Sequence, residues 1–115
     1  MAQNDLGGMY YEGLGVPKDY KQAVKWYTKA AEQRYALAQY NLGIMYANGQ
    51  GVSPDYKYAY AWFSLAASQS DNADAVKSRD SVEELLSPQQ LIEAKEIAAQ
   101  IINRIDHQAR SKRNE

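Results

Sequence analysis

The residues that could do chemistry in this 115-residue sequence are few and scattered. His107 is the only histidine and there is no cysteine, so the chain offers no thiolate nucleophile, no disulfide and no cysteine ligand for zinc. His107 falls in a polar C-terminal segment, where a solvated side chain is expected. The acidic residues in this half lack the spacing of a metal site or a catalytic carboxylate pair: Asp71, Asp74, Glu83 and Glu84. We therefore predict no catalytic residue, no metal site and no cofactor.

Two short glycine motifs look superficially like phosphate-binding loops. Residues 13–15 read Gly-Leu-Gly, and residues 49–51 read Gly-Gln-Gly. A phosphate loop follows a strand and carries either a further glycine or a Lys-Ser/Thr pair, and neither motif has this context. Both are therefore interpreted as turns that recur with an internal repeat.

Charge and hydropathy exclude several classes of partner. A formal net charge of -1 gives no general attraction to nucleic acid or to an anionic membrane. A helix C-terminus favours positive charge, which explains the basic residues near the end of the chain: Arg104, Arg110, Lys112 and Arg113. No apolar run approaches the roughly 20 residues of a membrane span, and no signal segment follows Met1. We expect a soluble chain without nucleic-acid binding or membrane insertion, and the sequence assigns no compartment.

The elements that would position a functional side chain follow from an internal repeat. When the sequence is shifted by 36 residues, identical residues superpose without any gap. We call these positions the repeat signature: Leu6 and Leu42, Gly7 and Gly43, Tyr10 and Tyr46, Gly13 and Gly49, Gly15 and Gly51, Asp19 and Asp55, Ala23 and Ala59, Trp26 and Trp62. A period of this length is typical of a solenoid of stacked helix pairs.

Within each unit the spacing predicts a helix, a loop and a second helix. Apolar residues recur at helical intervals on both sides of the glycine loop. Gly13 and Gly49 are predicted to end the first helix of each unit in a left-handed conformation, which glycine adopts readily. Asp19 and Asp55 are predicted to cap the second helix by accepting from its first free amides.

Small and large residues of the signature predict how the two helices of a unit pack. Gly7 and Gly43 lie inside helices, where glycine costs up to about 1 kcal/mol relative to alanine, so a close crossing with the partner helix is expected. Trp26 and Trp62 are predicted to lie in the packed layer. Truncation of either to alanine should then cost about 3 to 5 kcal/mol.

The repeat signature, together with the segment 6–16 and Lys29-Ala30-Ala31, resembles the Sel1-like repeat, a relative of the tetratricopeptide repeat. The resemblance covers residues 2–70, and the second copy departs from it at Leu65, which replaces the usual lysine. It implies an all-α fold, a right-handed superhelix of antiparallel helix pairs. It also implies that the first helix of each pair lines a concave face.

Residues 71–115 lack the glycine loop and are predicted to form a degenerate capping pair of helices. Ser87-Pro88-Gln89-Gln90 supplies an N-cap, a proline at the first helical position and a glutamine three residues after the cap. An apolar stripe is predicted on the last helix: Leu91, Ile92, Ala94, Lys95, Ala98, Ile101, Ile102 and Ile105. The chain is thus expected to form a single repeat domain, with units at 1–35, 36–70 and 71–115.

The concave face supplies the candidate binding residues. The repeat register places several positions of the first helices on this concave face. Six of them are predicted to contact a partner: Asn4, Tyr11, Glu12, Tyr40, Ile44 and Asn48. Exposed tyrosine and isoleucine side chains are typical of contact zones that contribute strongly to binding. The same side chains would also suit packing between adjacent helices, so both interpretations stay open.

We predict an adaptor that binds a protein or peptide in this groove, and no enzyme. A homo-oligomeric scaffold is the first alternative, because the sequence begins inside the first helix and leaves its outer face uncovered. Either further residues precede this segment in the natural protein, or another chain covers that face. An accessory role with a hydrolase of cell-wall material is the second alternative, and it rests on family analogy alone.

Overall fold

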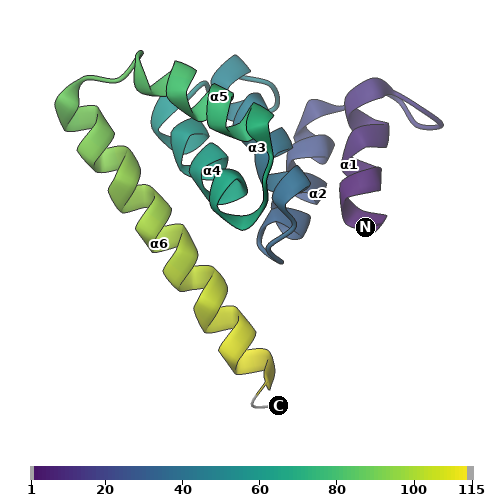
Figure 1. Cartoon of the computed structure of the whole chain (residues 1–115). Coiled ribbons are helices and arrows are strands. Elements are labelled where there is room, and N and C mark those ends of the chain that lie inside the picture. The colour runs from purple at the N-terminus through teal and green to yellow at the C-terminus, as the bar shows by residue number, and fades with distance from the viewer. Residues whose placement is uncertain (1, 114–115) are drawn as a thin grey trace.

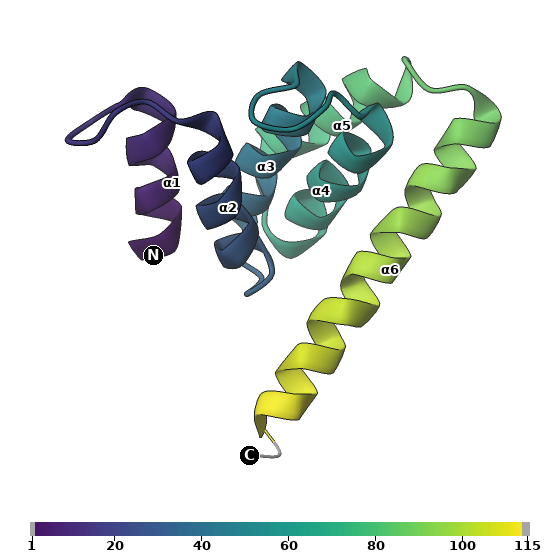
Figure 2. The ribbon, with the colours of Figure 1, turned by 180° about the vertical axis from the view of Figure 1, so that it is seen from behind.

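Six helices follow one another within residues 2–113 (Figure 1). The structure, a computed structural model, describes residues 2–113, and within that range it contains no strand. The helices are α1 (Ala2–Glu12), α2 (Tyr20–Ala31), α3 (Ala36–Asn48), α4 (Tyr56–Gln69), α5 (Ala73–Glu83) and α6 (Pro88–Arg113). The pairs α1/α2 and α3/α4 are antiparallel and stack side by side (Figures 1 and 2). The predicted all-α solenoid is therefore confirmed.

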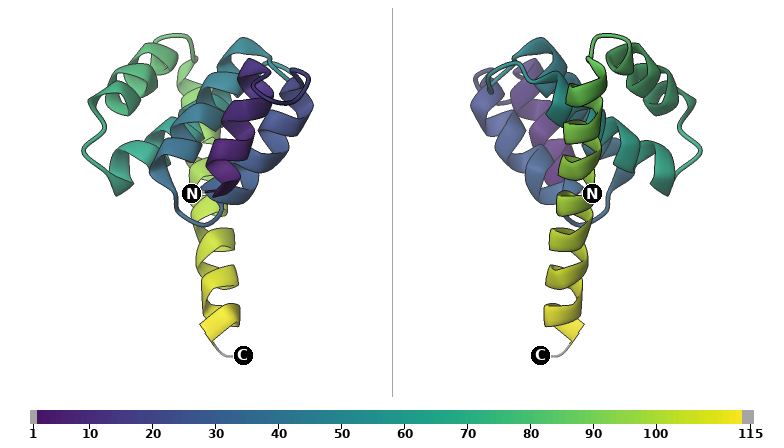
Figure 3. Two further views of the ribbon diagram at one scale, coloured as in Figure 1. Left: turned by 90° about the vertical axis from the view of Figure 1, so that its right-hand side faces the viewer. Right: turned by 90° about the vertical axis from the view of Figure 1, so that its left-hand side faces the viewer.

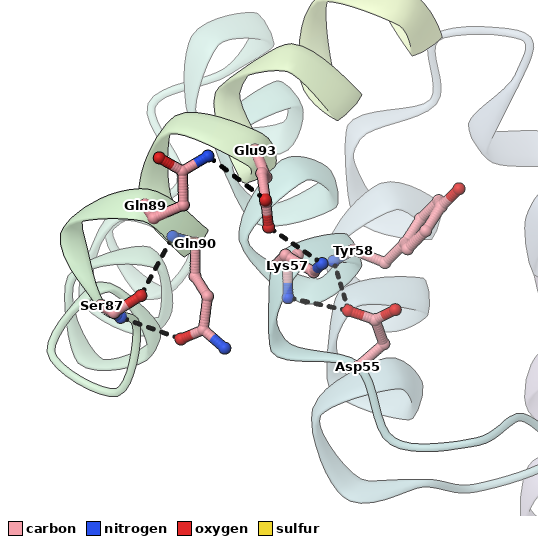
Figure 4. A network of polar contacts seen from close by, with 7 residues as sticks. All are labelled: Asp55, Lys57, Tyr58, Ser87, Gln89, Gln90 and Glu93. Carbon is pink, nitrogen blue, oxygen red and sulfur yellow. Dashed lines mark hydrogen bonds and ion pairs between the residues drawn. The ribbon is translucent and has the colours of Figure 1, made fainter.

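The loops within the two units have the predicted conformations. Gly13 and Gly49 adopt φ angles of 73° and 69°, in the left-handed region where a side chain would be strained. The carboxylate of Asp19 accepts from the N–H of the third residue after it at 3.2 Å. Asp55 accepts from the N–H groups of the second and third residues after it, at 3.0 and 3.3 Å (Figure 4). These contacts confirm the predicted helix ends and caps.

The glycines inside α1 and α3 mark close helix crossings. A Cβ atom at Gly7 would lie 2.6 Å from the ring of Tyr27 on α2. One at Gly43 would lie 2.7 Å from the ring of Phe63 on α4. Since no real Cβ contact is this short, the aromatic rings occupy the space that any other residue would need. The predicted close crossing is confirmed in both units.

Alanine substitutions should distinguish a glycine at a close helix crossing from a helical glycine with free space around it. We expect Gly43→Ala to lower the free energy of unfolding by about 1 to 3 kcal/mol, because the packed ring of Phe63 must shift to admit the added carbon. Gly8→Ala should raise it by about 0.5 to 1 kcal/mol, since the nearest heavy atom outside the helix lies 3.7 Å from the added carbon. Urea unfolding followed by circular dichroism measures both. If both substitutions changed the free energy of unfolding in the same direction, the close crossing at Gly43 would be contradicted.

The two tryptophans have different environments, although they occupy equivalent positions. Trp62 is 3% exposed and belongs to a buried cluster contributed by α2, α3, α4 and α6. Trp26 is only partly buried, and the Lys29 ammonium lies 4.6 Å from its ring centroid. The prediction that both lie in the core is right for Trp62 and wrong for Trp26. The difference arises because α6 packs on α4, whereas α2 has no equivalent cover among residues 2–113.

The arrangement of α5 and α6 differs from the predicted capping pair. Both helices pack on α4, and they make little contact with each other. Figures 1 and 2 show α6 diverging from α5 after their short connection. The C-terminal half of α6 extends beyond the other helices (Figure 3). α5 therefore continues the series of first helices, and α6 leaves the stack to cover α4.

One row of side chains on α4 explains where α6 packs. Lys57, Ala61 and Leu65 follow each other at intervals of four residues and so lie on one face of α4. The Lys57 ammonium pairs with Glu93 on α6 at 3.2 Å (Figure 4), and Leu65 shares a buried cluster with two isoleucines of α6. The equivalent positions on α2 are all exposed lysines: Lys21, Lys25 and Lys29. Replacement of two lysines by alanine and leucine thus creates the apolar face that α6 covers.

The first turn of α6 forms the predicted capping box (Figure 4). The Ser87 N–H donates to Oε1 of Gln90 at 2.9 Å, and the Gln90 N–H donates to the Ser87 hydroxyl at 3.1 Å. Hydrogen bonding from Gln89, together with Lys57, lowers the pKa of Glu93 below its ordinary value. The capping box is local to the chain, whereas the contact between Lys57 and Glu93 also joins the start of α6 to α4.

Two ion pairs connect the C-terminal half of α6 to the end of α2. The Arg104 guanidinium lies 3.0 Å from Glu32, and Asp106 pairs with Arg34. Arg34 is the one described non-glycine residue with a positive φ, 67°, in the turn between α2 and α3. The basic residue Arg104, expected only to complement the helix dipole, thus also bridges two helices.

Candidate interaction groove

Two adjoining hollows lie between the first helices of successive units, and together we call them the groove. The hollow between α1 and α3 has a volume of ≈ 350 Å³. It is lined by Tyr11, Glu12, Tyr27, Leu37, Asn41 and Ile44. The hollow between α3 and α5 has a volume of ≈ 280 Å³. It is lined by Ile44, Ala47, Asn48, Phe63, Lys77, Ser78, Ser81 and Val82. Ile44 lines both hollows, so they adjoin at this side chain.

The hollow between α1 and α3 combines aromatic surface with hydrogen-bonding groups. The rings of Tyr11 and Tyr20 lie 5.3 Å apart, so Tyr11 is held between α1 and α2. The Nδ2 group of Asn41 donates to Oδ1 of Asn4 at 3.4 Å, which leaves further amide capacity free for a ligand. Burial, with smaller contributions from Tyr11 and Glu12, raises the pKa of Tyr27 above its ordinary value. The phenol of Tyr27 can donate a hydrogen bond.

The hollow between α3 and α5 is apolar at its base and polar at one edge. Phe63 and Val82 are buried and form its floor together with partly buried Ile44. The polar edge comes from α5, through the ammonium of Lys77 and two serine hydroxyls. Such a surface offers area for an apolar side chain and groups that would bind a peptide backbone.

The structure brings four of the six predicted contact residues to the groove. They are Tyr11, Glu12, Ile44 and Asn48. Asn4 is 8% exposed and is engaged by Asn41, so it lies beneath the surface. Tyr40 is partly buried and packs against a buried cluster of α4, α5 and α6, with its ring 5.7 Å from that of Phe63. For these two residues the packing interpretation holds, and binding by the other four stays a prediction.

Sequence reasoning missed the contribution of α5 and two residues of α3. Leu37 and Asn41 line the first hollow, and Lys77 lines the second. The 36-residue shift that relates the two units also places Asn41 on Lys77, so the signal was present in the sequence. It was overlooked because the glycine loop, which marks the other units most clearly, is missing from the third.

Other candidate sites have less support. His107 is exposed on α6. Residues 2–113 contain no cluster of three or more side chains suited to a metal ion. No helix in this part of the chain combines the length and hydropathy needed to cross a membrane. Two smaller hollows of ≈ 140 and ≈ 210 Å³ flank Arg34 beneath α6, and one of ≈ 310 Å³ adjoins Asp55. None of these three is repeated along the stack.

Comparison with known proteins agrees with this architecture. The Sel1 repeat model matches residues 1–35 and 36–71. Over 33 residues, the chain is 52% identical to a putative sel1-like repeat-containing protein of Acanthamoeba polyphaga mimivirus. That match covers 29% of this chain and 6% of the viral protein.

Two solved structures resemble the chain closely. One is c5321, a protective antigen present in uropathogenic Escherichia coli strains that displays an SLR fold. It superposes with a TM-score of 0.87 and 38% identity, over 96% of this chain and 24% of the antigen. The other is a Sel1 repeat protein from Oxalobacter formigenes, with a TM-score of 0.62 and 47% identity over 64% of this chain and 29% of that protein. The chain spans about a quarter of both structures, and it belongs to the Sel1 repeat family.

Proposed function

We propose that this chain is an adaptor module that binds a peptide segment of another protein in the groove formed by α1, α3 and α5. Sel1 repeats commonly act as protein-interaction modules. The observation that carries the proposal for this chain is the pair of adjoining hollows, which share Ile44 and combine apolar floors with amide, phenol and hydroxyl groups. α6 contributes no residue to either hollow, so the groove stays open.

Substitutions in the groove test this function. We expect Leu37→Ser and Ile44→Ser to reduce retention of a partner at least 10-fold, because each removes an apolar contact worth about 1.5 to 3 kcal/mol when fully buried. Leu37 is 46% exposed, so its substitution should leave the fold intact even if Ile44→Ser lowers stability. Affinity capture from cells that express the protein, followed by mass spectrometry, measures retention.

The matched control is Ile102→Ser, which removes an exposed isoleucine of α6 outside the groove. A partner retained by the wild type and by Ile102→Ser, and lost by both groove variants, is the expected outcome. Retention of the same proteins by all four chains would show that binding does not use the groove.

Self-association through α1 is the second candidate, favoured by the comparison of equivalent residues. Leu42 and Met45 of α3 are each 1% exposed, because α2 packs against them. The equivalent Met9 of α1 is 36% exposed, so this face of α1 has room for another helix. The sedimentation mass of the chain in solution tests this candidate directly.

A further inference from the structure

We infer that the groove selects a cationic partner, an extended segment that carries lysine or arginine beside apolar side chains. This inference rests on the proposed function, and it adds the chemistry of the ligand. It follows from the way charge is divided between the helices that line the groove and those that form the outer layer.

Charge is separated across the two layers of the solenoid. The outer helices α2 and α4 carry four lysines, Lys21, Lys25, Lys29 and Lys57, and three of their caps are acidic: Asp19, Glu32 and Asp55. Among the helices of the groove, α1 carries two acids and no base, and α3 carries no charge. Three acids and two bases lie on α5, and a further acid, Glu84, is its C-cap. Counted with their caps, the groove helices carry six acids and two bases, a net charge of -4, whereas α2 and α4 carry four lysines and three acids, a net charge of +1.

The repeat places these charges in rows across the groove. Asn41, Ile44 and Asn48 of α3 all line the hollows, and of their equivalents 36 residues away Glu12 on α1 and Lys77 on α5 line them as well. The row through Asn41 contains Asp5 and Lys77. The row through Asn48 contains Glu12 and Glu84, at the C-terminal ends of α1 and α5. This last row, which we call the acidic rim, has two carboxylates: Glu12 lines the first hollow, and Glu84 follows the residues of α5 that line the second. Lys18 packs beside Gly13 at the end of α1, and its ammonium lies over the ring of Tyr20.

Two further observations favour a positive ligand at the acidic rim. Neither Glu12 nor Glu84 takes part in an ion pair among the described residues, and both are exposed. The rim also coincides with the C-terminal ends of α1, α3 and α5, where the helix dipole adds partial negative charge. A lysine or arginine of the partner would find uncompensated charge here, next to hollows that accept apolar side chains.

A selection from random peptides tests the inference. The probe is a phage-displayed library of dodecapeptides selected on the whole chain. We expect the enriched peptides to carry lysine or arginine beside apolar residues, and to shift the amide NMR signals of Asn41, Ile44 and Lys77. One enriched peptide is then titrated by fluorescence anisotropy against the wild type and against Glu12→Gln/Glu84→Gln. The double variant should bind about 5- to 10-fold more weakly, as expected for the loss of two exposed charge pairs.

The control variant is Asp71→Asn/Glu96→Gln, which removes the same charge from exposed positions outside the groove. It should bind within about 2-fold of the wild type, because screening limits the effect of distant charges. Enriched peptides without a positive bias that still shift the groove signals would overturn the inference and leave the proposed function standing. Absence of any peptide that shifts these signals would overturn both.

Discussion

Trp62→Ala is expected to lower the free energy of unfolding by about 3 to 5 kcal/mol. The indole is 3% exposed and lies in the buried cluster that joins α2, α3 and α4 to Ile101 and Ile105 of α6. Its removal leaves a cavity at the junction of four helices, which the rigid neighbouring helices cannot close fully. Thermal or urea unfolding followed by far-ultraviolet circular dichroism measures the change.

The equivalent substitution Trp26→Ala is the control for this prediction. Trp26 is only partly buried and has lysine rather than α6 beside its ring, so a loss of roughly 1 to 2 kcal/mol is expected. Equal losses from the two substitutions would mean that α6 contributes nothing to the environment of Trp62.

Leu65→Lys should be as damaging as the loss of Trp62, although it restores the residue found at the equivalent position of the first unit. Leu65 is 3% exposed beneath α6, and Asp106, the acidic side chain that lines the hollow beside it, already pairs with Arg34. An unpaired buried charge destabilises a protein by about 3 to 5 kcal/mol, so either α6 leaves α4 or the whole chain loses that stability. Hydrogen exchange of α6 amides, compared with global unfolding, distinguishes these two results.

Lys29→Leu makes the reverse exchange on α2 and serves as the control. Lys29 is exposed, so the change should stay within about 1 kcal/mol, part of it from the lost contact with Trp26. A wild-type unfolding midpoint and wild-type exchange for Leu65→Lys would show that α6 does not rest on this face.

The two full units were predictable because the local sequence features that end and cap their helices agree with the repeat that relates one unit to the other. The left-handed glycines and the capping aspartates act within a few residues, and their duplication at one spacing reveals the stacking as well. The close crossings at Gly7 and Gly43 follow from the same logic, because glycine inside a helix has a cost that packing must offset.

The position of α6 was not predictable from its own sequence. Its apolar stripe predicts that it packs, but a stripe does not specify which face it meets. The face that α6 contacts is determined by α4, where Leu65 replaces the expected lysine. This replacement is explained only by the structure, in which Leu65 packs against α6. The position of α6 on α4 also explains why Trp62 is a core residue and Trp26 is not.

The groove was predicted in part, for a related reason. Helical periodicity identifies the faces of α1 and α3, and it correctly placed Tyr11 and Ile44 there. It does not distinguish a residue exposed in the groove from one engaged in helix packing, as for buried Asn4 and partly buried Tyr40. That distinction depends on the depth at which neighbouring helices cross, which is a property of the assembled layers.

The docking of α6 on α4 also makes the two units unequal as building blocks. The first unit has lysines on the face of α2 that corresponds to the α6-binding face of α4. This face is stable in contact with solvent, so such a unit fits any position within an array. Residues 36–71 present alanine and leucine there and are suited only to the place directly beneath α6. If this protein were lengthened by duplication, in evolution or in the laboratory, the first unit would therefore be the one to copy. The second unit would have to remain the last of the array, directly beneath α6.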